Sequence, residues 1–196
     1  GRSATFSPDG NWLGTATTNQ VNVWRIQDGK LAHDPSLVFQ ARLGLYGHGL
    51  IFTPDGNRLV TMTSGEGGKI WNLHDPESRP ISLANSGGGK LLISFDNRWL
   101  VASSVDSVLL WDLSSTDELL MPIELEAADP NEGRAISLDS KWLVTGTRWW
   151  NLEDIHTVRS HNSLVVSAGV GFSSERSELN ALSKSFLRRY EVLLDN

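Results

Sequence analysis

A unit of about forty residues recurs along the chain, and this repetition restricts the fold more than any other feature of the sequence. Five segments align on an apolar reference residue that precedes a turn. The reference residues are Phe6, Phe52, Ile93, Ile136 and Phe172, which lie 46, 41, 43 and 36 residues apart. A unit this small cannot hide its own apolar faces, so neighbouring units are expected to stack.

Each unit is predicted to contain three consecutive strands. The first strand ends at a turn such as Pro8-Asp9-Gly10 or Pro54-Asp55-Gly56, where proline presets one dihedral angle and glycine accepts a positive φ. Second strands are predicted at residues 12–16, 59–63, 99–103 and 142–146. Third strands are predicted to end in an aromatic residue, namely Trp24, Trp71, Trp111, Trp150 and Tyr190.

Short apolar stretches between the units complete the pattern. They cover residues 37–39, 81–83 and 123–125 and are predicted to form outer, fourth strands. Four short antiparallel strands per unit are typical of a β-propeller blade, so we predict an all-β propeller domain with about five blades. The predicted blades are 1–43, 44–84, 85–126, 127–160 and 161–196. Residues 179–194 are assigned to strand in the fifth unit.

The segments FSPDGNWL with VNVW, FTPDGNRLV with KIWNL, and DNRWLVASSVDSVLLWDL resemble the second half of the repeat in the WD-repeat family. The resemblance covers nearly the whole chain and implies a propeller that binds other proteins. The Trp-Asp dipeptide itself occurs once, at Trp111-Asp112. The turn Asp of the family is matched by Asp106, with Asn19 and Glu66 at the equivalent places, and a Gly-His dipeptide occurs only at Gly47-His48.

The fourth unit is about four residues shorter than the others between its second and third strands. Either its turn is truncated or residues are absent from the sequence. Neither end of the chain obviously supplies the strand that closes a ring in this family. We therefore expect a fragment of a larger propeller, within a multidomain protein or complex, instead of a closed ring of five blades.

Composition narrows the choice of partners. The 17 Lys and Arg residues against 23 Asp and Glu residues give a net charge of −6, which argues against binding a nucleic acid backbone. No apolar run is long enough for a membrane-spanning helix. The absence of cysteine excludes disulfides and thiol nucleophiles but leaves the compartment open, and we expect a cytoplasmic location over a secreted one.

Residues that could support catalysis have simpler structural interpretations. His156 and His161 lie in a predicted loop without a helix to bring them together at a metal. The carboxylate pairs Asp117-Glu118 and Glu153-Asp154 fall in predicted connections, where they are expected to be solvated. The glycine-rich segment 86–90 precedes a strand instead of a helix, unlike a phosphate-binding loop. We therefore predict no catalytic residues, no metal site and no cofactor.

The predicted function is that of a non-catalytic scaffold which binds a protein or peptide through loops on the propeller rim. Trp149, beside Arg148 at the shortened turn, is predicted to be an exposed anchor for a partner. The full set of predicted contact residues is Asn19, Tyr46, Glu66, Lys90, Arg134, Arg148, Trp149 and His161. The alternatives are a propeller enzyme or sensor that binds a small molecule or metal in its central channel, and a structural or regulatory appendage.

Overall fold

The computed structural model describes residues 3–17, 19–40, 49–63, 67–85, 91–103, 107–126, 133–145, 148–155, 161–162, 170–172 and 179–181. Over these residues the regular secondary structure consists of β-strands. No helix in this part of the chain is long and apolar enough to cross a membrane.

The strands form four sheets in succession, followed by a two-stranded one. The first sheet contains β1 (Ser3–Phe6), β2 (Trp12–Ala16), β3 (Gln20–Gln27), β4 (Lys30–Leu31) and β5 (Leu37–Gln40). The second contains β6 (Gly49–Phe52), β7 (Arg58–Thr63), β8 (Gly67–Asn72), β9 (Ile81–Leu83) and, from further along the chain, β13 (Leu119–Leu120).

The third sheet contains β10 (Leu92–Ile93), β11 (Trp99–Ser103), β12 (Ser107–Asp112) and β14 (Ile123–Glu126). The fourth contains β15 (Arg134–Ile136), β16 (Trp142–Thr145), β17 (Arg148–Asn151) and β18 (His161–Asn162). The fifth pairs β19 (Val170–Phe172) with β20 (Leu179–Ala181).

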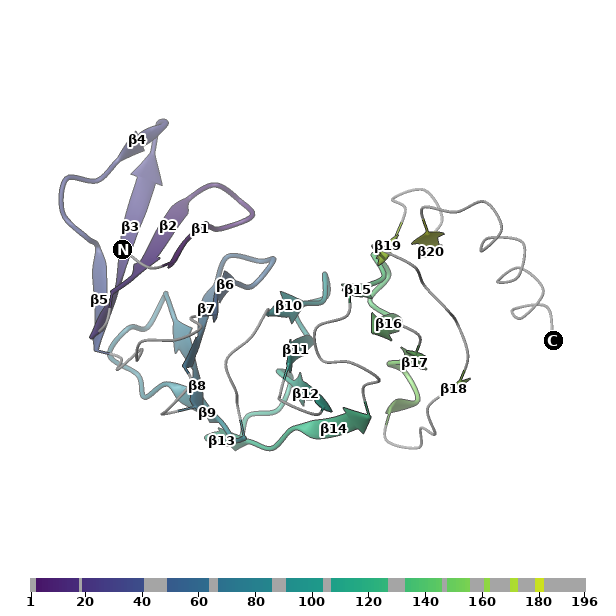
Figure 1. Ribbon diagram of the computed structural model, residues 1–196. Coiled ribbons are helices and arrows are strands. Elements are labelled where there is room, and N and C mark those ends of the chain that lie inside the picture. Colours follow the sequence, from purple (N-terminus) through teal and green to yellow (C-terminus); the bar gives the residue numbers. More distant parts are fainter. Residues whose placement is uncertain are drawn as a thin grey trace.

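The sheets stand side by side along an arc (Figure 1). Their first strands lie toward the concave side, where β1 contacts β6, β10 contacts β15, and β15 contacts β19. The outer strands β5, β9 and β14 lie on the convex side. The chain is therefore an all-β protein of successive antiparallel sheets, as the repeat predicted.

The predicted strands agree closely with the observed ones. The second strands at 12–16 and 99–103 and the outer strand at 81–83 are confirmed residue for residue. The other outer strands extend one residue further, and β20 covers only the first three residues of the segment 179–194, whose remainder lies outside the described residues.

The shortened fourth repeat is explained by a shorter hairpin. Strands β16 and β17 form four residue pairs, whereas the equivalent strands of the second sheet form six. The pairing of Leu143 with Trp150 still matches that of Leu59 with Trp71, so the sheet geometry is kept. The fourth sheet is completed by β18, so this unit runs past the boundary at residue 160 that the spacing suggested.

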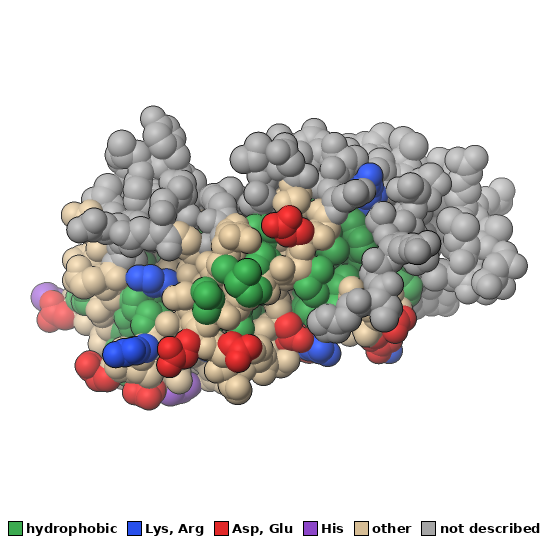
Figure 2. All heavy atoms as spheres, turned by 90° about the horizontal axis from the view of Figure 1, so that it is seen from below, with side chains coloured by type: hydrophobic (Ala, Val, Ile, Leu, Met, Phe, Trp, Pro, Cys, Tyr) green, Lys and Arg blue, Asp and Glu red, His purple; other side chains and the backbone are tan. Residues whose placement is uncertain are grey.

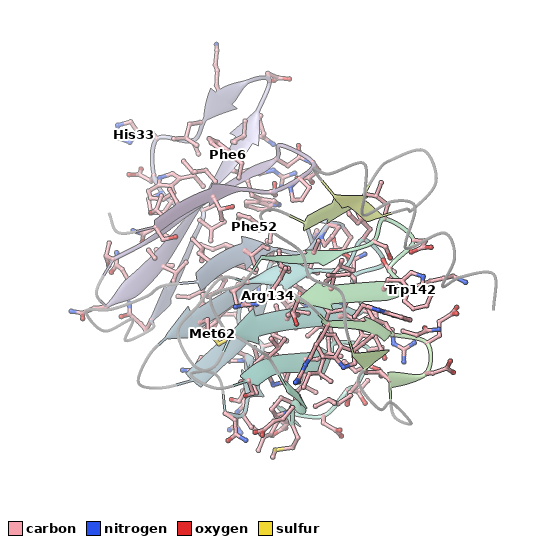
Figure 3. All side chains as sticks on the ribbon, turned by 45° about the vertical axis from the view of Figure 1, so that its right-hand side comes forward. Phe6, His33, Phe52, Met62, Arg134 and Trp142 are labelled. Atoms are coloured by element: carbon pink, nitrogen blue, oxygen red, sulfur yellow. The ribbon has the colours of Figure 1, made fainter. Side chains whose placement is uncertain are left out.

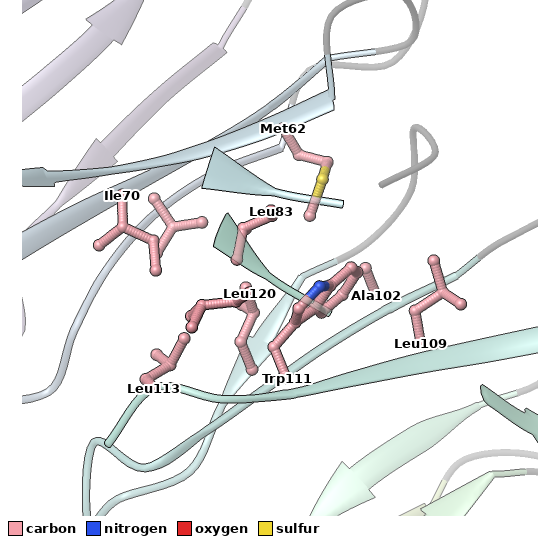
Figure 4. Close-up of a cluster of buried hydrophobic side chains, with 10 residues drawn as sticks. Met62, Ile70, Leu83, Ala102, Leu109, Trp111, Leu113 and Leu120 are labelled. Carbon is pink, nitrogen blue, oxygen red and sulfur yellow. The ribbon is translucent and has the colours of Figure 1, made fainter. Parts of the chain in front are cut away.

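Three apolar clusters fill the spaces between neighbouring sheets. The one between the second and third sheets is shown in Figure 4, where Met62, Ile70 and Leu83 face Leu109 and Trp111. Strands in these central sheets are buried on both faces, as in the run Leu100, Val101 and Ala102. Because each sheet has two apolar faces, the core is continuous only when the sheets are stacked.

The third-strand tryptophans fill these clusters, with one exception. Trp71, Trp111 and Trp150 are buried. Trp24 is only half-buried, because no sheet precedes the first one among the described residues. At the starts of the second strands, Trp12 and Trp99 are also buried, whereas Trp142 is half-buried.

One hydrogen bond distinguishes two of these tryptophans. Trp71 Nε1 donates to Thr61 Oγ1 over 3.0 Å inside the second sheet. At the equivalent place in the third sheet stands Ala102, and Trp111 Nε1 has no hydrogen-bond partner among the described residues. The third sheet therefore forgoes a polar contact that the second one makes.

Replacing Thr61 by valine is expected to lower the free energy of unfolding by about 1–3 kcal/mol, because the buried Trp71 N–H loses its acceptor while the volume is kept. Thr15→Val is the matched control, since Thr15 holds the equivalent position beside half-buried Trp24. Urea unfolding followed by circular dichroism measures both. Equal losses of unfolding free energy in the two variants would contradict a stabilising role for the Trp71–Thr61 hydrogen bond.

A strand exchange links the second and third sheets. After β12 the chain crosses to the second sheet, where β13 pairs in parallel with β9 before β14 returns to the third sheet. Ser82 and Ala84 donate backbone hydrogen bonds to Glu118 and Leu120. Leu120 is buried in the cluster between the second and third sheets. The crossing segment therefore adds both backbone hydrogen bonds and apolar contacts between these two sheets.

Candidate functional site

Four of the eight predicted contact residues lie together at one end of the fourth sheet. Arg134 pairs with Thr145, which pairs with Arg148 on the next strand. Directly opposed residues point to the same face of a sheet, so both arginines lie on one face. In the adjacent row Trp149 pairs with His161. We call this group of four residues the β15–β18 end.

The prediction for Trp149 is wrong in its details. Trp149 is not at a turn but inside β17, and it is half-buried instead of exposed. Its ring lies 5.3 Å from that of Trp142, at a tilt of 60°. The shortening falls in the loop between β16 and β17, whereas β17 itself still begins at Arg148. Trp149 therefore lies in the strand and not at the turn, where the shortened spacing had placed it.

The other predicted residues divide into two groups. Asn19 is exposed in the hairpin between β2 and β3, which is the equivalent end of the first sheet. His161 was expected in a loop but belongs to strand β18, opposite Trp149. Tyr46, Glu66 and Lys90 lie outside the described residues, as do Asp106 and the Gly47-His48 dipeptide.

The opposite end of the sheets carries a hydrogen-bonded turn that recurs four times. In the first sheet Ser7 Oγ donates to Asp9 Oδ1 and accepts from the backbone N–H of Trp12 over 2.9 Å. The same arrangement is repeated by Thr53 with Asp55, Ser94 with Asp96, and Ser137 with Asp139. We call these four turns the turn row.

Neighbouring turns in the row are hydrogen-bonded to each other. The backbone N–H of Asp55 donates to Asn97 Oδ1 over 2.9 Å, and that of Asp96 donates to Ser140 Oγ over 3.1 Å. The accepting residues and the equivalent Gly56 all have φ near +60° to +70°. At Gly56 a β-carbon would lie 2.8 Å from Asp9 Oδ2, so glycine leaves room for the neighbouring carboxylate.

The sequence predicts the turns but not the contacts between them. A signal was present, since a hydroxyl residue stands two positions before Asp in all four units. The contacts join residues 42 and 44 positions apart, which no local pattern reveals. The turn row therefore gives this end of the protein a fixed spacing of carboxylates.

Hydrogen bonds lower the pKa of three carboxyl groups at this end, those of Asp9, Asp55 and Asp112. Partial burial alone would raise the pKa of Asp55, but donors at Thr53 and Asn57 outweigh it and hold the pKa below the ordinary value of 3.8. Asp9 has a lowered pKa for the same reasons. Asp112 is partly buried too, and its lowered pKa follows from hydrogen bonds donated by Arg98 and Ser114.

Acidification is expected to destabilise the protein through these groups. A carboxyl whose pKa is lower in the folded state contributes stability above its unfolded pKa, and this contribution is lost as the pH falls through the folded value. The loss is therefore expected below about pH 3.8. Asp55→Asn should flatten the dependence of unfolding free energy on pH in this range. If unfolding free energy depends on pH in Asp55→Asn as steeply as in the wild type, the lowered pKa of Asp55 does not contribute to this dependence.

Acidic side chains dominate the exposed connections on this side. Figure 2 shows Asp and Glu side chains spread along one edge of the described surface, with some Lys, Arg and His side chains among them and hydrophobic side chains beside them. The exposed connections after the third strands carry Asp75, Glu77, Asp117, Glu118, Glu153 and Asp154. In the described part of the chain no group of three or more His, Asp or Glu residues is placed to hold a metal ion.

Comparisons with known proteins identify the fold only in general terms. No protein-family model matches the chain, and no curated protein matches it. Among solved structures, the Kuenenia stuttgartiensis hydrazine synthase is similar, with a TM-score of 0.56 and 16% sequence identity. The match covers 85% of this chain and 50% of that one, so the chain spans about half of its neighbour. At this identity the similarity concerns the fold alone.

Proposed function

We propose that the chain is part of a WD-type β-propeller that acts as a scaffold and binds a protein or peptide through rim loops, with the β15–β18 end of the fourth sheet as the contact surface. Each stacked sheet would be one blade, and the arc would be a segment of the ring. The observation that carries the proposal is the pairing of Arg134 and Arg148 with Thr145, which places both arginines on one face at one end of the fourth sheet, with Trp149 on the opposite face at the same end.

The scaffold supports this role because it is rigid behind the proposed contact surface. Leu143 and Trp150 are buried between the third and fourth sheets, and Trp142 packs on Trp149. Loops held by such a framework are where binding sites evolve in many folds. Arginine and tryptophan are also the residues that most often dominate binding energy at protein interfaces.

Charge adds a kinetic expectation. The net charge of −6 favours encounter with a basic or mixed-charge partner over an acidic one. The arginines on the β15–β18 end would then pair with carboxylates of a mixed-charge segment, while the acidic surroundings attract its basic residues. Association should slow as salt is added, because screening shortens the range of the field.

Selection from a displayed library of random peptides tests the proposal. Peptides enriched on the wild-type protein should bind the Arg148→Glu variant at least about tenfold more weakly, equivalent to about 1.4 kcal/mol. Trp149 is unsuitable as the first variant, because its removal would also disturb Trp142.

Arg79→Glu is the matched control, since Arg79 is exposed in the connection after β8. Circular dichroism verifies that both variants fold. The proposal is wrong if no peptide is enriched, or if the enriched peptides bind Arg148→Glu as well as they bind the wild type.

A second candidate is an enzyme or sensor domain that binds a small molecule or metal on the concave side of the arc. It is favoured by the similarity to hydrazine synthase, whose name is that of an enzyme. Thermal unfolding in the presence of divalent metal ions and of a small-molecule metabolite panel separates the two. A saturable rise in melting temperature would favour this candidate, because a ligand of the folded state stabilises it by mass action.

A further inference from the structure

The face of the first sheet that points away from the second sheet is apolar and uncovered. The same face of each of the next three sheets is covered by the sheet before it. Phe6 is 64% exposed, whereas Phe52, at the equivalent position, is 2% exposed. Leu13 and Trp24 continue this face and are half-buried. Their equivalents are buried in each of the next three units, namely Leu59, Leu100 and Leu143 for Leu13, and Trp71, Trp111 and Trp150 for Trp24. We call Phe6, Leu13 and Trp24 the open face.

The covered equivalents show what such a face requires. Phe52 lies between the first and second sheets (Figure 3) and belongs to their shared cluster. A β-carbon on Gly14 of the first sheet would lie 3.2 Å from the Phe52 ring. The missing side chain at Gly14 therefore makes room for the phenylalanine. In the next two units the reference residue is the smaller Ile93 or Ile136, and valine replaces this glycine at Val60 and Val101.

The connection after the third strand provides a second, independent observation. In the third unit this connection reaches back to the preceding sheet, where β13 pairs with β9 and buries Leu120. In the first unit the corresponding connection forms β4, which pairs only with its own β3 among the described residues. Its Leu31 is 51% exposed. The first unit thus presents both the face and the connection that a preceding sheet would engage.

We propose that the open face is a docking surface for a further sheet of this repeat pattern, whose second strand carries glycine opposite Phe6. The bulk of Phe6 matches that of Phe52, so valine at the facing position would overpack the contact. Continuity with the three packed interfaces favours this occupant over a protein of another fold. The proposal concerns the sheet faces and does not depend on binding at the β15–β18 end.

Thiol labelling provides the test, because the chain contains no cysteine. Residues 1–46 are duplicated ahead of the full chain, which keeps the native spacing of 46 residues between reference positions. A Leu13→Cys substitution in the original copy, which keeps Phe6 in place, should react at least about tenfold more slowly in this extended protein than in the unextended chain, because docking shields it. Gly14→Val in the added copy should restore the fast reaction, because the valine would overpack against the retained Phe6 ring.

Met121→Cys is the control, since Met121 is 65% exposed on the outer side of the third unit and should react equally in both proteins. Equal reactivity of the cysteine at position 13 with and without the added copy would overturn the proposal, whether or not that copy folds. Slow reaction already in the unextended chain, with concentration-dependent dimers in sedimentation, would instead assign the face to a second copy of this chain and would also overturn it.

Discussion

Replacing Trp111 by alanine is expected to lower the free energy of unfolding by about 3–5 kcal/mol, the largest loss from a single side chain in this protein. Trp111 is fully buried between the second and third sheets, where it contacts side chains from both. Removing it would leave a cavity that two rigid sheets cannot close. Urea unfolding followed by far-ultraviolet circular dichroism measures the loss.

Trp24→Ala is the matched control for this prediction. Trp24 occupies the same repeat position but belongs to the open face and is half-buried. Its removal should cost roughly 1–2 kcal/mol, because much of the ring is already in water in the folded state. Losses of the same size at Trp24 and Trp111 would mean that the sheets are not stacked in the order described.

Replacing Phe52 by alanine is expected to cost about 3–4 kcal/mol, because its ring fills the space over Gly14 between the first and second sheets. Phe6→Ala, at the equivalent reference position, should cost less than about 1 kcal/mol, because its ring is 64% exposed. The shift of the urea midpoint reports both values. A large loss at Phe6 in the unextended chain would show that its face is already covered.

The strands could be predicted from the sequence because each carries its own local signal. Turn residues such as Pro8 and Gly10 and the alternation of apolar residues mark strand ends to within a residue or two. The repeat also placed Trp71, Trp111 and Trp150, which are buried, at the same position as Trp24, which is half-buried. Local chemistry and repetition together were enough for the fold class.

Features that depend on contacts between units could not be predicted in this way. The bond from Asp55 to Asn97 joins two turns that are adjacent only after the sheets stack. The parallel pairing of β13 with β9 likewise joins segments of different units. Half-burial of Trp149 follows from its contact with Trp142, and the sequence showed only that it stands next to Arg148.

The candidate site was predicted in part for the same reason. Arg134, Arg148, Trp149 and His161 were selected from separate segments, and strand pairing brings these four together. Asn19 lies at the equivalent end of the first sheet. Its distance from the four residues of the fourth sheet is set by how the sheets are arranged along the arc. The composition of the site could thus be proposed from the sequence, whereas its arrangement required the register of the strands.

The stacking of consecutive repeat sheets through their apolar faces is tested most directly by a double-mutant cycle across one interface. Gly14→Val alone should destabilise the protein by about 1–3 kcal/mol, because the new side chain meets the Phe52 ring. Combined with Phe52→Ile, which recreates the residue pair of the next two units, the same change should cost little. We predict a coupling energy of at least about 1 kcal/mol, whereas losses that add to within about 0.5 kcal/mol would contradict the stacked arrangement.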